Sequence, residues 1–177
     1  MEVQCRTQSR MDESLTQTDW CGWLEQHTPR LLLFARQKAR SDADAQDLVQ
    51  DAVVEALQRQ GDGQPPPLAL VFATIHRRAI DLARREDRRA NREIAALEPG
   101  PDAWFDSSVE DRELQQLIQN AMSRLSENFR EVVTLKVWGG LTFAEIAAAL
   151  GIPANTASSR YRYGLEELRR LTKEVLA

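Results

Sequence analysis

Apolar and polar residues alternate at helical spacing along most of the chain, and this pattern is clearest near residue 145. Over residues 143–150 the apolar positions are those of a short amphipathic helix. Thr142 and Glu145 have the spacing of a capping box at the start of this helix. Gly151 can adopt the left-handed conformation that ends a helix, and Pro153 fits the first turn of the next one. The pattern predicts a helix-turn-helix.

The second helix of this motif combines inward-facing apolar positions with a polar and cationic face. Ala157, Tyr161, Leu165 and Leu168 recur at helical spacing. The other face carries the candidate DNA-reading residues Asn155, Thr156, Ser158, Ser159, Arg160 and Arg162. Hydrogen-bonding and guanidinium groups on one helix suit a DNA major groove. The alternative is an ordinary helical hairpin whose arginines are solvated.

Residues 41–60 form another amphipathic pattern, in which an acidic face lies opposite the apolar stripe. The acidic ridge, as we call this face, comprises Asp44, Asp47, Gln50, Asp51 and Glu55. A charged helix face is usually just solvated, but it can also be a docking surface for a basic partner.

A proline-rich loop over residues 61–67 precedes a long helical pattern that starts near Leu68. The first half of this helix is apolar. The second half is dense in arginine, with Arg77, Arg78, Arg84, Arg85, Arg88, Arg89 and Arg92. In an otherwise acidic chain, such a patch is either a binding surface for phosphates or a solvated face stabilised by side-chain pairs.

The remaining segments predict an all-α fold with two helical domains. Residues 1–18 are polar and lack periodicity, which indicates a flexible N-terminal extension. Residues 19–97 form the first domain, and the proline-containing segment 98–110 is a linker. Residues 111–177 form a second domain of four helices, in which Ser126 is placed to cap the second helix.

Composition and charge narrow the classes of function. With 177 residues, a net charge of −4 and a pI near 5.3, the chain does not coat nucleic acid over its whole surface, so any DNA contact must come from local patches. No apolar run is long enough to cross a bilayer, and no hydrophobic leader is present, which predicts a cytoplasmic protein without a membrane partner. Cys5, Cys21, His27 and His76 lie in no ligand motif. We therefore expect no metal, no cofactor and no catalytic residue.

The order of these features resembles the extracytoplasmic-function sigma factors of bacterial RNA polymerase. Three stretches carry the resemblance: DAQDLVQDAVVEAL at residues 44–57, VFATIHRRAIDLARRE at residues 71–86, and residues 125–169 around the helix-turn-helix. The resemblance implies a promoter-specificity subunit with no catalysis of its own. Its two domains would be sigma domain 2 and sigma domain 4.

The resemblance also implies roles for particular residues. The core-polymerase-binding residues would be Asp47, Leu48, Gln50 and Asp51. The residues that contact the −10 promoter element would be Arg77, Arg78, Arg84, Arg85 and Arg88. The recognition-helix residues named above would read the −35 element. The implied partners are core RNA polymerase and promoter DNA. Relatives are commonly held by an anti-sigma factor as well, but nothing in the sequence identifies one.

Three positions depart from the family pattern. Arg77 stands where the family usually has asparagine, and Ser158 stands where a lysine or arginine is frequent. Ser126 replaces a common proline. The base captured near the start site and the preferred upstream sequence therefore do not follow from relatives.

Two other classes of function remain as alternatives. A conventional transcription regulator would combine the helix-turn-helix with a sensor or dimerisation domain, but the first half lacks the strand and helix alternation of a receiver. An enzyme would need a nucleophile context, a glycine-rich phosphate loop or a metal site. The acidic residues Asp44, Asp47 and Asp51 lie on one helix without partners from a second helix, which is typical of a solvated face.

Overall fold

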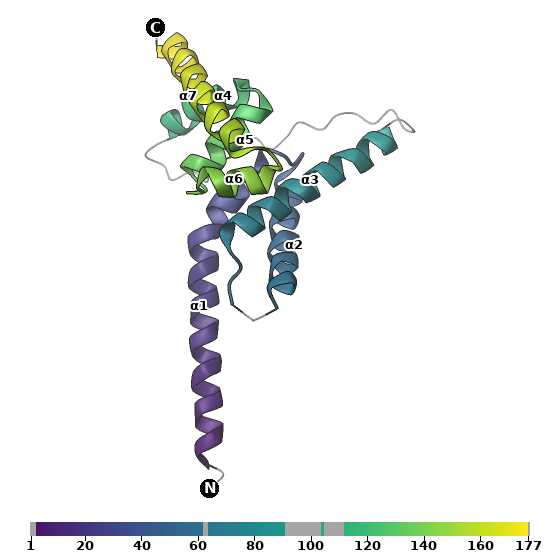
Figure 1. The fold of residues 1–177 in the computed structure, drawn as a ribbon, viewed down its shortest axis with the longest axis vertical. Helices are drawn as coiled ribbons and strands as arrows, with labels where there is room; N and C mark the ends of the chain where they lie inside the picture. Colours follow the sequence, from purple (N-terminus) through teal and green to yellow (C-terminus); the bar gives the residue numbers. More distant parts are fainter. Residues whose placement is uncertain (1–2, 62–63, 91–103, 105–111, 177) are drawn as a thin grey trace.

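The computed structural model describes residues 3–61, 64–90, 104 and 112–176, and it describes side chains for residues 20–61, 64–84, 104 and 113–173. All regular structure in this part of the chain is helical, as predicted (Figure 1). The helices are α1 Val3–Arg36, α2 Asp42–Gln60, α3 Leu68–Ala90, α4 Arg112–Arg124, α5 Glu127–Val137, α6 Phe143–Leu150 and α7 Ala154–Leu176.

Helices α1, α2 and α3 pack together in the N-terminal half. The Ser41 hydroxyl caps α2 by accepting a hydrogen bond from the Asp44 N–H at 3.1 Å. Gly61 ends α2 with a φ of 73°, a left-handed conformation that suits glycine. The rings of Phe34 in α1 and Phe72 in α3 meet edge to face, with 5.5 Å between their centroids. Burying each ring contributes roughly 1.5–3 kcal/mol, so this pair fixes α1 against α3.

The predicted helix-turn-helix is present in α6 and α7. The Thr142 N–H donates to Glu145 Oε2 at 2.8 Å, and the Glu145 N–H donates to the Thr142 hydroxyl at 3.3 Å, which completes the capping box. Gly151 ends α6 with a φ of 65°. The first four backbone N–H groups of a helix have no hydrogen-bond partner within the helix, so a cap must supply one. The sequence correctly predicted the cap of α6.

Helix α7 lies close against α5 because a glycine stands at the contact. A Cβ atom on Gly164 would lie 2.9 Å from Val133 Cγ2 and 3.3 Å from Phe129 Cβ. Ser126 occupies the N-cap position of α5, but its hydroxyl makes no capping hydrogen bond, so the expected cap interaction is absent. The start of α5 therefore depends on packing rather than on this side chain.

One apolar core continues from the N-terminal half into the C-terminal half. The same buried cluster contains Phe72 and Ile75 of α3, Leu135 of α5 and Ile146 of α6, and each of these is at most 1% exposed. Figure 1 shows α6 lying beside α3, and these two helices contact each other, as do α1 and α5. The sequence pattern predicted two modules and gave no signal for this contact. The boundaries of the modules stay a prediction.

Helix α1 begins earlier than the sequence pattern predicted. Its backbone is helical from Val3, within the segment expected to be an extension without regular structure. The physical reason is that residues 3–18 contain neither glycine nor proline, and the glycine and the proline of α1, Gly22 and Pro29, lie further along the helix. Polarity argued against a buried segment, but polar residues without breakers can still form a helix.

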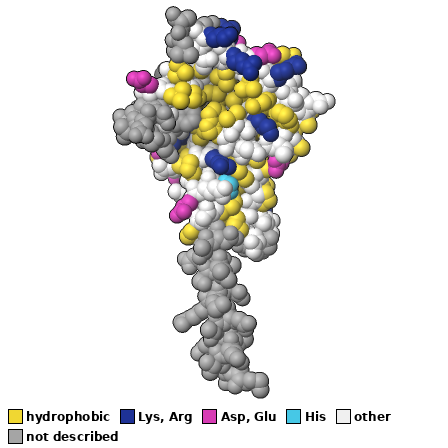
Figure 2. All heavy atoms as spheres, turned by 90° about the vertical axis from the view of Figure 1, so that its left-hand side faces the viewer, with side chains coloured by type: hydrophobic (Ala, Val, Ile, Leu, Met, Phe, Trp, Pro, Cys, Tyr) yellow, Lys and Arg dark blue, Asp and Glu magenta, His cyan; other side chains and the backbone are white. Residues whose placement is uncertain are grey.

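Some apolar side chains remain on the surface. Figure 2 shows them gathered on one face of the upper body, with lysine and arginine side chains distributed among them. Val54, Leu114, Val137 and Tyr163 are each about half exposed, at 52%, 54%, 50% and 48%. None of the helices in the described part combines the length and the apolar character that crossing a bilayer requires.

Candidate nucleic-acid and partner interfaces

Helix α2 turns most of the acidic ridge toward solvent. Asp47, Gln50 and Asp51 are exposed, as expected for a docking surface. Leu48 is different, because it is 7% exposed and belongs to the apolar core. Most of its side chain supports the ridge from beneath, and the part that remains accessible lines the hollow between α2 and α3 described below. A direct contact of Leu48 with a partner stays a prediction.

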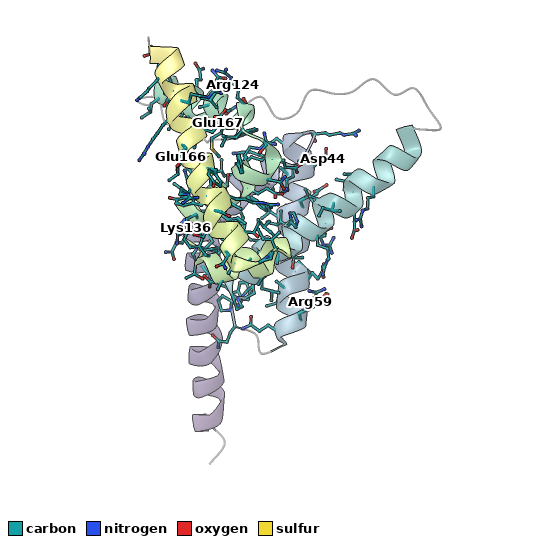
Figure 3. The ribbon with its side chains drawn as sticks, turned by 45° about the horizontal axis from the view of Figure 1, so that its top comes forward. Asp44, Arg59, Arg124, Lys136, Glu166 and Glu167 are labelled. Atoms are coloured by element: carbon teal, nitrogen blue, oxygen red, sulfur yellow. The ribbon has the colours of Figure 1, made fainter. Side chains whose placement is uncertain are left out.

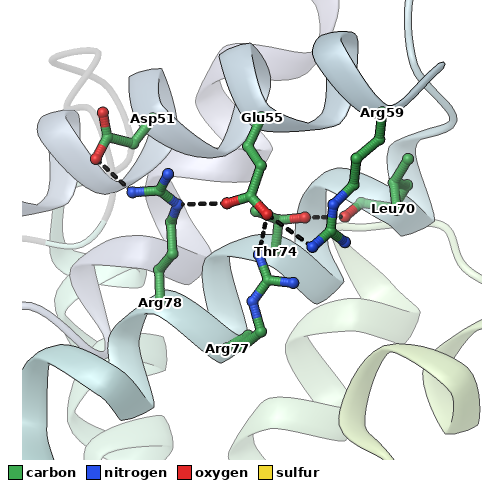
Figure 4. A network of polar contacts seen from close by, with 7 residues as sticks. All are labelled: Asp51, Glu55, Arg59, Leu70, Thr74, Arg77 and Arg78. Atoms are coloured by element: carbon green, nitrogen blue, oxygen red, sulfur yellow. Dashed lines mark hydrogen bonds and ion pairs between the residues drawn. The ribbon is translucent and has the colours of Figure 1, made fainter. Parts of the chain in front are cut away.

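Two of the predicted DNA-binding arginines are paired with the acidic ridge (Figure 4). Arg78 bridges two carboxylates: its Nη1 lies 2.5 Å from Asp51 Oδ2, and its Nε lies 2.8 Å from Glu55 Oε2. The Arg77 guanidinium donates to the other oxygen of Glu55, and Arg59 Nη2 lies 2.8 Å from that oxygen. The hydrogen bond from Arg77 is the largest cause that lowers the pKa of Glu55 below its ordinary value.

A hollow of about 390 Å³ lies between α2 and α3 beside these ion pairs. Its lining includes Asp47 and Asp51 from the ridge and Arg78 and Asp81 from α3. The candidate polymerase-docking residues and the candidate DNA-binding residues thus share one surface. Within the described part, no group of three or more His, Cys, Asp or Glu side chains is arranged to hold a metal.

The other predicted arginines of α3 lie beyond this network. The side chain of Arg84 is 72% exposed, and its Nη1 lies 3.9 Å from Asp81 Oδ1. The side chains of Arg85 and Arg88 lie outside the described residues, although their backbone belongs to α3. Arg84 is therefore the described residue of this group that is most accessible to a phosphate.

The first turns of α7 present the predicted DNA-reading side chains in different ways. Asn155, Ser158 and Arg162 are exposed, whereas Thr156, Ser159 and Arg160 are half-buried. The Ser159 hydroxyl donates to the Asn155 carbonyl oxygen at 2.8 Å, so one of its hydrogen-bonding groups is already used. Arg162 Nη2 donates to the Tyr163 hydroxyl at 3.0 Å, and its guanidinium lies 4.7 Å from that ring. Tyr163 orients Arg162 and was not singled out from the sequence.

The turn before the helix-turn-helix is fixed by Lys136, which Figure 3 labels. Lys136 Nζ donates to the Leu141 carbonyl oxygen at 2.9 Å and lies 5.0 Å above the Phe143 ring. The Phe143 ring in turn meets Tyr161 of α7 at a centroid distance of 5.7 Å. These contacts set where α6 begins and hold it against α7, so they position the recognition helix.

A buried charge between the two halves was missed by sequence reasoning. Glu131 of α5 is 7% exposed, and Lys38 Nζ donates to its Oε1. His76 Nδ1 of α3 lies 3.3 Å from the same oxygen. Burial alone would raise the pKa of Glu131, but the nearby His76 and Lys38 side chains outweigh it, so the pKa falls below its ordinary value. The one available signal is that Glu131 shares a helical stripe with the core residue Leu135.

The chain is similar to known proteins over most of its length. The family profile described as Sigma-70 region 2 matches residues 23–89, and the profile described as Sigma-70, region 4 matches residues 115–168. The RNA polymerase sigma factor CarQ of Myxococcus xanthus is 32% identical over 154 residues, which cover 84% of this chain and 86% of that protein. The ECF RNA polymerase sigma factor SigL of Mycobacterium tuberculosis is 30% identical over 155 residues, which cover 85% and 87%.

A solved structure is similar over most of the chain. It is the sigma factor RpoE in complex with the anti-sigma factor NepR from Bartonella quintana, with a TM-score of 0.71 and 25% identity. The match covers 88% of this chain and 97% of that one. Both the N-terminal and the C-terminal helices are therefore part of the likeness.

Proposed function

The chain belongs to the extracytoplasmic-function sigma factors of RNA polymerase, and from this premise we propose which surfaces hold the polymerase and the promoter. The protein is a promoter-recognising sigma factor, a transcription initiation factor rather than a catalytic enzyme. The family acts with RNA polymerase in the cell interior, and the cytoplasm is the proposed location of this protein. The match of residues 23–89 to sigma region 2 argues against a sensor or dimerisation domain in this half.

The acidic ridge is the proposed docking surface for core polymerase. Asp47, Gln50 and Asp51 are exposed on a helix whose other side is fixed in the core, so they present a rigid row of carboxylate and amide groups. Such a row suits a basic helical surface, because ionised carboxylates form the stronger hydrogen bonds with cationic donors. Leu48 contributes by holding α2 in place.

The arginines of α3 are the proposed contacts for the −10 element, and the first turns of α7 are the proposed reader of the −35 element. The Arg84 side chain is exposed to solvent. Arg77 and Arg78 form ion pairs with carboxylates of the acidic ridge, and these pairs must break or be shared when the two arginines bind phosphates. At the other end, Asn155, Ser158 and Arg162 are accessible at the start of the recognition helix. Hydrogen-bonding groups there suit base edges in the major groove.

The observation that carries the proposal is the joint presence of region 2 and region 4 in one chain, each built on its own set of helices. Two modest contacts joined by one chain give a bivalent grip, because the second contact forms at high effective concentration. An anti-sigma factor is a further proposed partner, since the similar RpoE structure contains NepR.

The test is run-off transcription with purified core polymerase and genomic DNA fragments. We expect new start sites when the protein is added, and a result at the level of core enzyme alone would refute the function. The docking surface is tested separately by co-purification of core polymerase with an Asp47→Lys/Asp51→Lys variant. A matched control is Glu25→Lys/Glu166→Lys, which makes the same charge change at two exposed positions on α1 and α7. Retention of the polymerase by the ridge variant at the level of this control would remove the assignment.

A further inference from the structure

Trp104 lies in the segment that joins the two halves, and its side chain is packed into the C-terminal half. The ring contacts the small apolar core that includes Met122 of α4, Val133 of α5 and Leu171 of α7. The Arg130 guanidinium of α5 lies 5.5 Å from the centre of the ring, which is the distance of a cation–π contact. A large aromatic ring held by packing and by a cation is a firm attachment point, because much of its apolar surface leaves water.

The backbone of Trp104 is held as well. Its N–H donates to Gln119 Oε1 of α4 at 2.9 Å, and its carbonyl oxygen accepts a hydrogen bond from Arg36 Nη1 of α1 at 3.0 Å. Arg36 has a second partner in Asp42, at 2.7 Å from its Nε, so Arg36 does not depend on Trp104. The ring packing, the Arg130 contact and the Gln119 hydrogen bond all come from the C-terminal half. Trp104 therefore belongs to that half in structure, although it precedes α4 in the sequence.

Attachment at Trp104 shortens the chain that can stretch between the halves. Helix α3 ends at Ala90 and α4 begins at Arg112, and this whole connection spans at most about 75 Å when fully extended. Trp104 and Arg112 both belong to the C-terminal half, so the residues between them add nothing to the reach. The remaining residues 91–103, which we call the tether, allow at most about 48 Å between Ala90 and Trp104. The attachment thus removes about a third of the reach.

The reach of the connection matters because the two promoter elements lie a set distance apart. Sites near −35 and −10 are separated by roughly 25 base pairs, or about 85 Å along B-DNA. A compact half of roughly 75 residues has a radius of gyration of about 11 Å, so the two halves together add about 30 Å to the connection. With the attachment the total is about 80 Å, close to the required span, and without it the total is about 105 Å, well beyond that span.

A connection near its full length is sensitive to the spacing of the two sites. Each base pair inserted between the elements adds about 3.4 Å and rotates one element about the DNA axis by about 35° relative to the other. The effective concentration of the second contact falls steeply once the connection can no longer cover the distance. A longer connection covers the same distance with chain to spare.

We propose that Trp104 sets the promoter spacing that the protein accepts, because it fixes the point from which the tether extends. Trp104 is a positioning residue in this role: it acts through the tether and determines how far α7 can lie from the arginines of α3. The proposal rests on the function proposed above, because spacing matters only for a protein that holds two promoter elements at once. Promoters with more widely spaced elements should therefore be used poorly.

The first experiment places the same insertion on either side of Trp104 and leaves Trp104 itself unchanged. Six glycine and serine residues are inserted after Gly100, within the tether, or after Ser107, beyond the attachment point. The templates are a promoter found by run-off mapping and versions with one, two or three base pairs added between −35 and −10, as counted from the mapped start site. Transcription with core polymerase on each template is divided by transcription on the original promoter.

The two insertions should give different spacing profiles. Two added base pairs should reduce transcription by wild type about tenfold, and the insertion after Gly100 should reduce this loss to about twofold, because the tether is longer. The insertion after Ser107 should keep the tenfold loss, since those residues do not contribute to the reach. The same profile for both insertions, whether it equals that of wild type or not, would overturn the proposal.

The second experiment compares two tryptophans that pack against the same small core. Trp138 contacts this core too, but it follows α5 and lies outside the connection between the halves. Trp104→Ala should accept added base pairs as the Gly100 insertion does, whereas Trp138→Ala should keep the narrow profile of wild type. Trp104→Phe, which retains a ring for the core, should restore most of that profile. Identical profiles for the two alanine variants would contradict the role of Trp104.

The outcomes also separate this inference from the proposed function. If wild type directs run-off transcription but the two insertions behave alike, the function stands and the role of Trp104 fails. If wild type supports no transcription on any template, the function itself fails. Circular dichroism establishes whether the alanine variants are folded, and the pair of insertions, which changes neither ring, decides the question if they are not.

Discussion

Two groups of paired acidic and basic side chains in this protein, one on the α2–α3 surface and one between the halves, differ in how far they are buried. On the α2–α3 surface, Arg78 and Asp51 are 34% and 63% exposed, so water and salt screen their attraction. Between the halves, Lys38 and Glu131 form an ion pair beside His76 of α3, and we call these three residues the clasp. The side chains of Lys38 and Glu131 are only 5% and 9% exposed. Exposed pairs contribute about 0–1 kcal/mol, whereas losing one partner of a buried pair costs about 3–5 kcal/mol. The exposed pairs on the α2–α3 surface can therefore exchange partners readily. The buried pair of Lys38 and Glu131 determines how the N-terminal and C-terminal halves pack.

The largest effect should come from removing the cation of the clasp. In Lys38→Ala, the Glu131 carboxylate stays buried with only His76 beside it. The free energy of unfolding should therefore fall by about 3 kcal/mol. For a chain of this size that corresponds to a fall in Tm of roughly 6–12 °C, measured by calorimetry at neutral pH. Lys38→Met is the useful comparison, because it keeps most of the apolar stem and removes only the charge. A Tm within 1 °C of wild type for both variants would show that the buried pair contributes no more to stability than the exposed pairs on the α2–α3 surface.

Acid should weaken the clasp, because it protonates the Glu131 carboxylate. Its pKa lies below the ordinary glutamate value, so the folded protein favours the ionised form. The clasp stability is therefore fully present above that ordinary value and is lost as pH falls through the lowered pKa. The groups facing Glu131 are Lys38, His76 and, more distantly, Glu127 on the same helix. The Tm of the wild-type protein should fall on acidification, and Glu131→Gln should lack this component of the fall. An identical acid profile for both proteins would assign the change to other groups.

Local structure could be predicted from the sequence because its signals are short. Thr142, Glu145 and Gly151 lie within ten residues of one another and determine where α6 begins and ends. The exposure of Asp47 and Asp51 also follows from helical periodicity. Ser126 shows the limit of this reasoning, since it has the right position for a cap and makes no capping hydrogen bond.

Contacts between distant segments could not be predicted in the same way. Lys38 and Glu131 are separated by 93 positions, and nothing in the sequence around either residue indicates that it meets the other. The pairing of Arg78 with Asp51 could not be predicted either. Helical periodicity shows on which face of a helix a residue lies, but it does not show which other helix packs against that face. Helical periodicity places Leu48 in the apolar stripe of residues 41–60, which agrees with its burial. The family resemblance instead assigned Leu48 to the surface that binds the polymerase.

A smaller effect should follow from neutralising the central carboxylate of the exposed network. Glu55 contacts Arg59, Arg77 and Arg78, and its side chain is 21% exposed. Glu55→Gln should therefore cost no more than about 1 kcal/mol in the free energy of unfolding. The same change removes the ion pairs of Arg77 and Arg78 with Glu55 and leaves Arg78 paired with Asp51. Binding of single-stranded DNA by the polymerase complex should therefore become tighter and more dependent on salt. A loss of stability as large as that of Lys38→Ala would show that the two groups are alike.

The smallest effect should come from Asp51→Asn at the edge of the network. The Asp51 side chain is 63% exposed and pairs with Arg78 at 2.5 Å, and Arg78 also bonds to Glu55 and keeps that bond in the variant. Unfolding in urea should shift by less than about 0.5 kcal/mol, because an exposed pair gains little over hydration. Binding to core polymerase should weaken several-fold, since the amide keeps the shape of the ridge and loses its charge. Gln58→Glu on the same helix is the control for a change of one charge away from the ridge. A stability change without a binding change would mean that Asp51 serves the fold, and the exposed network would then resemble the clasp in role despite its exposure.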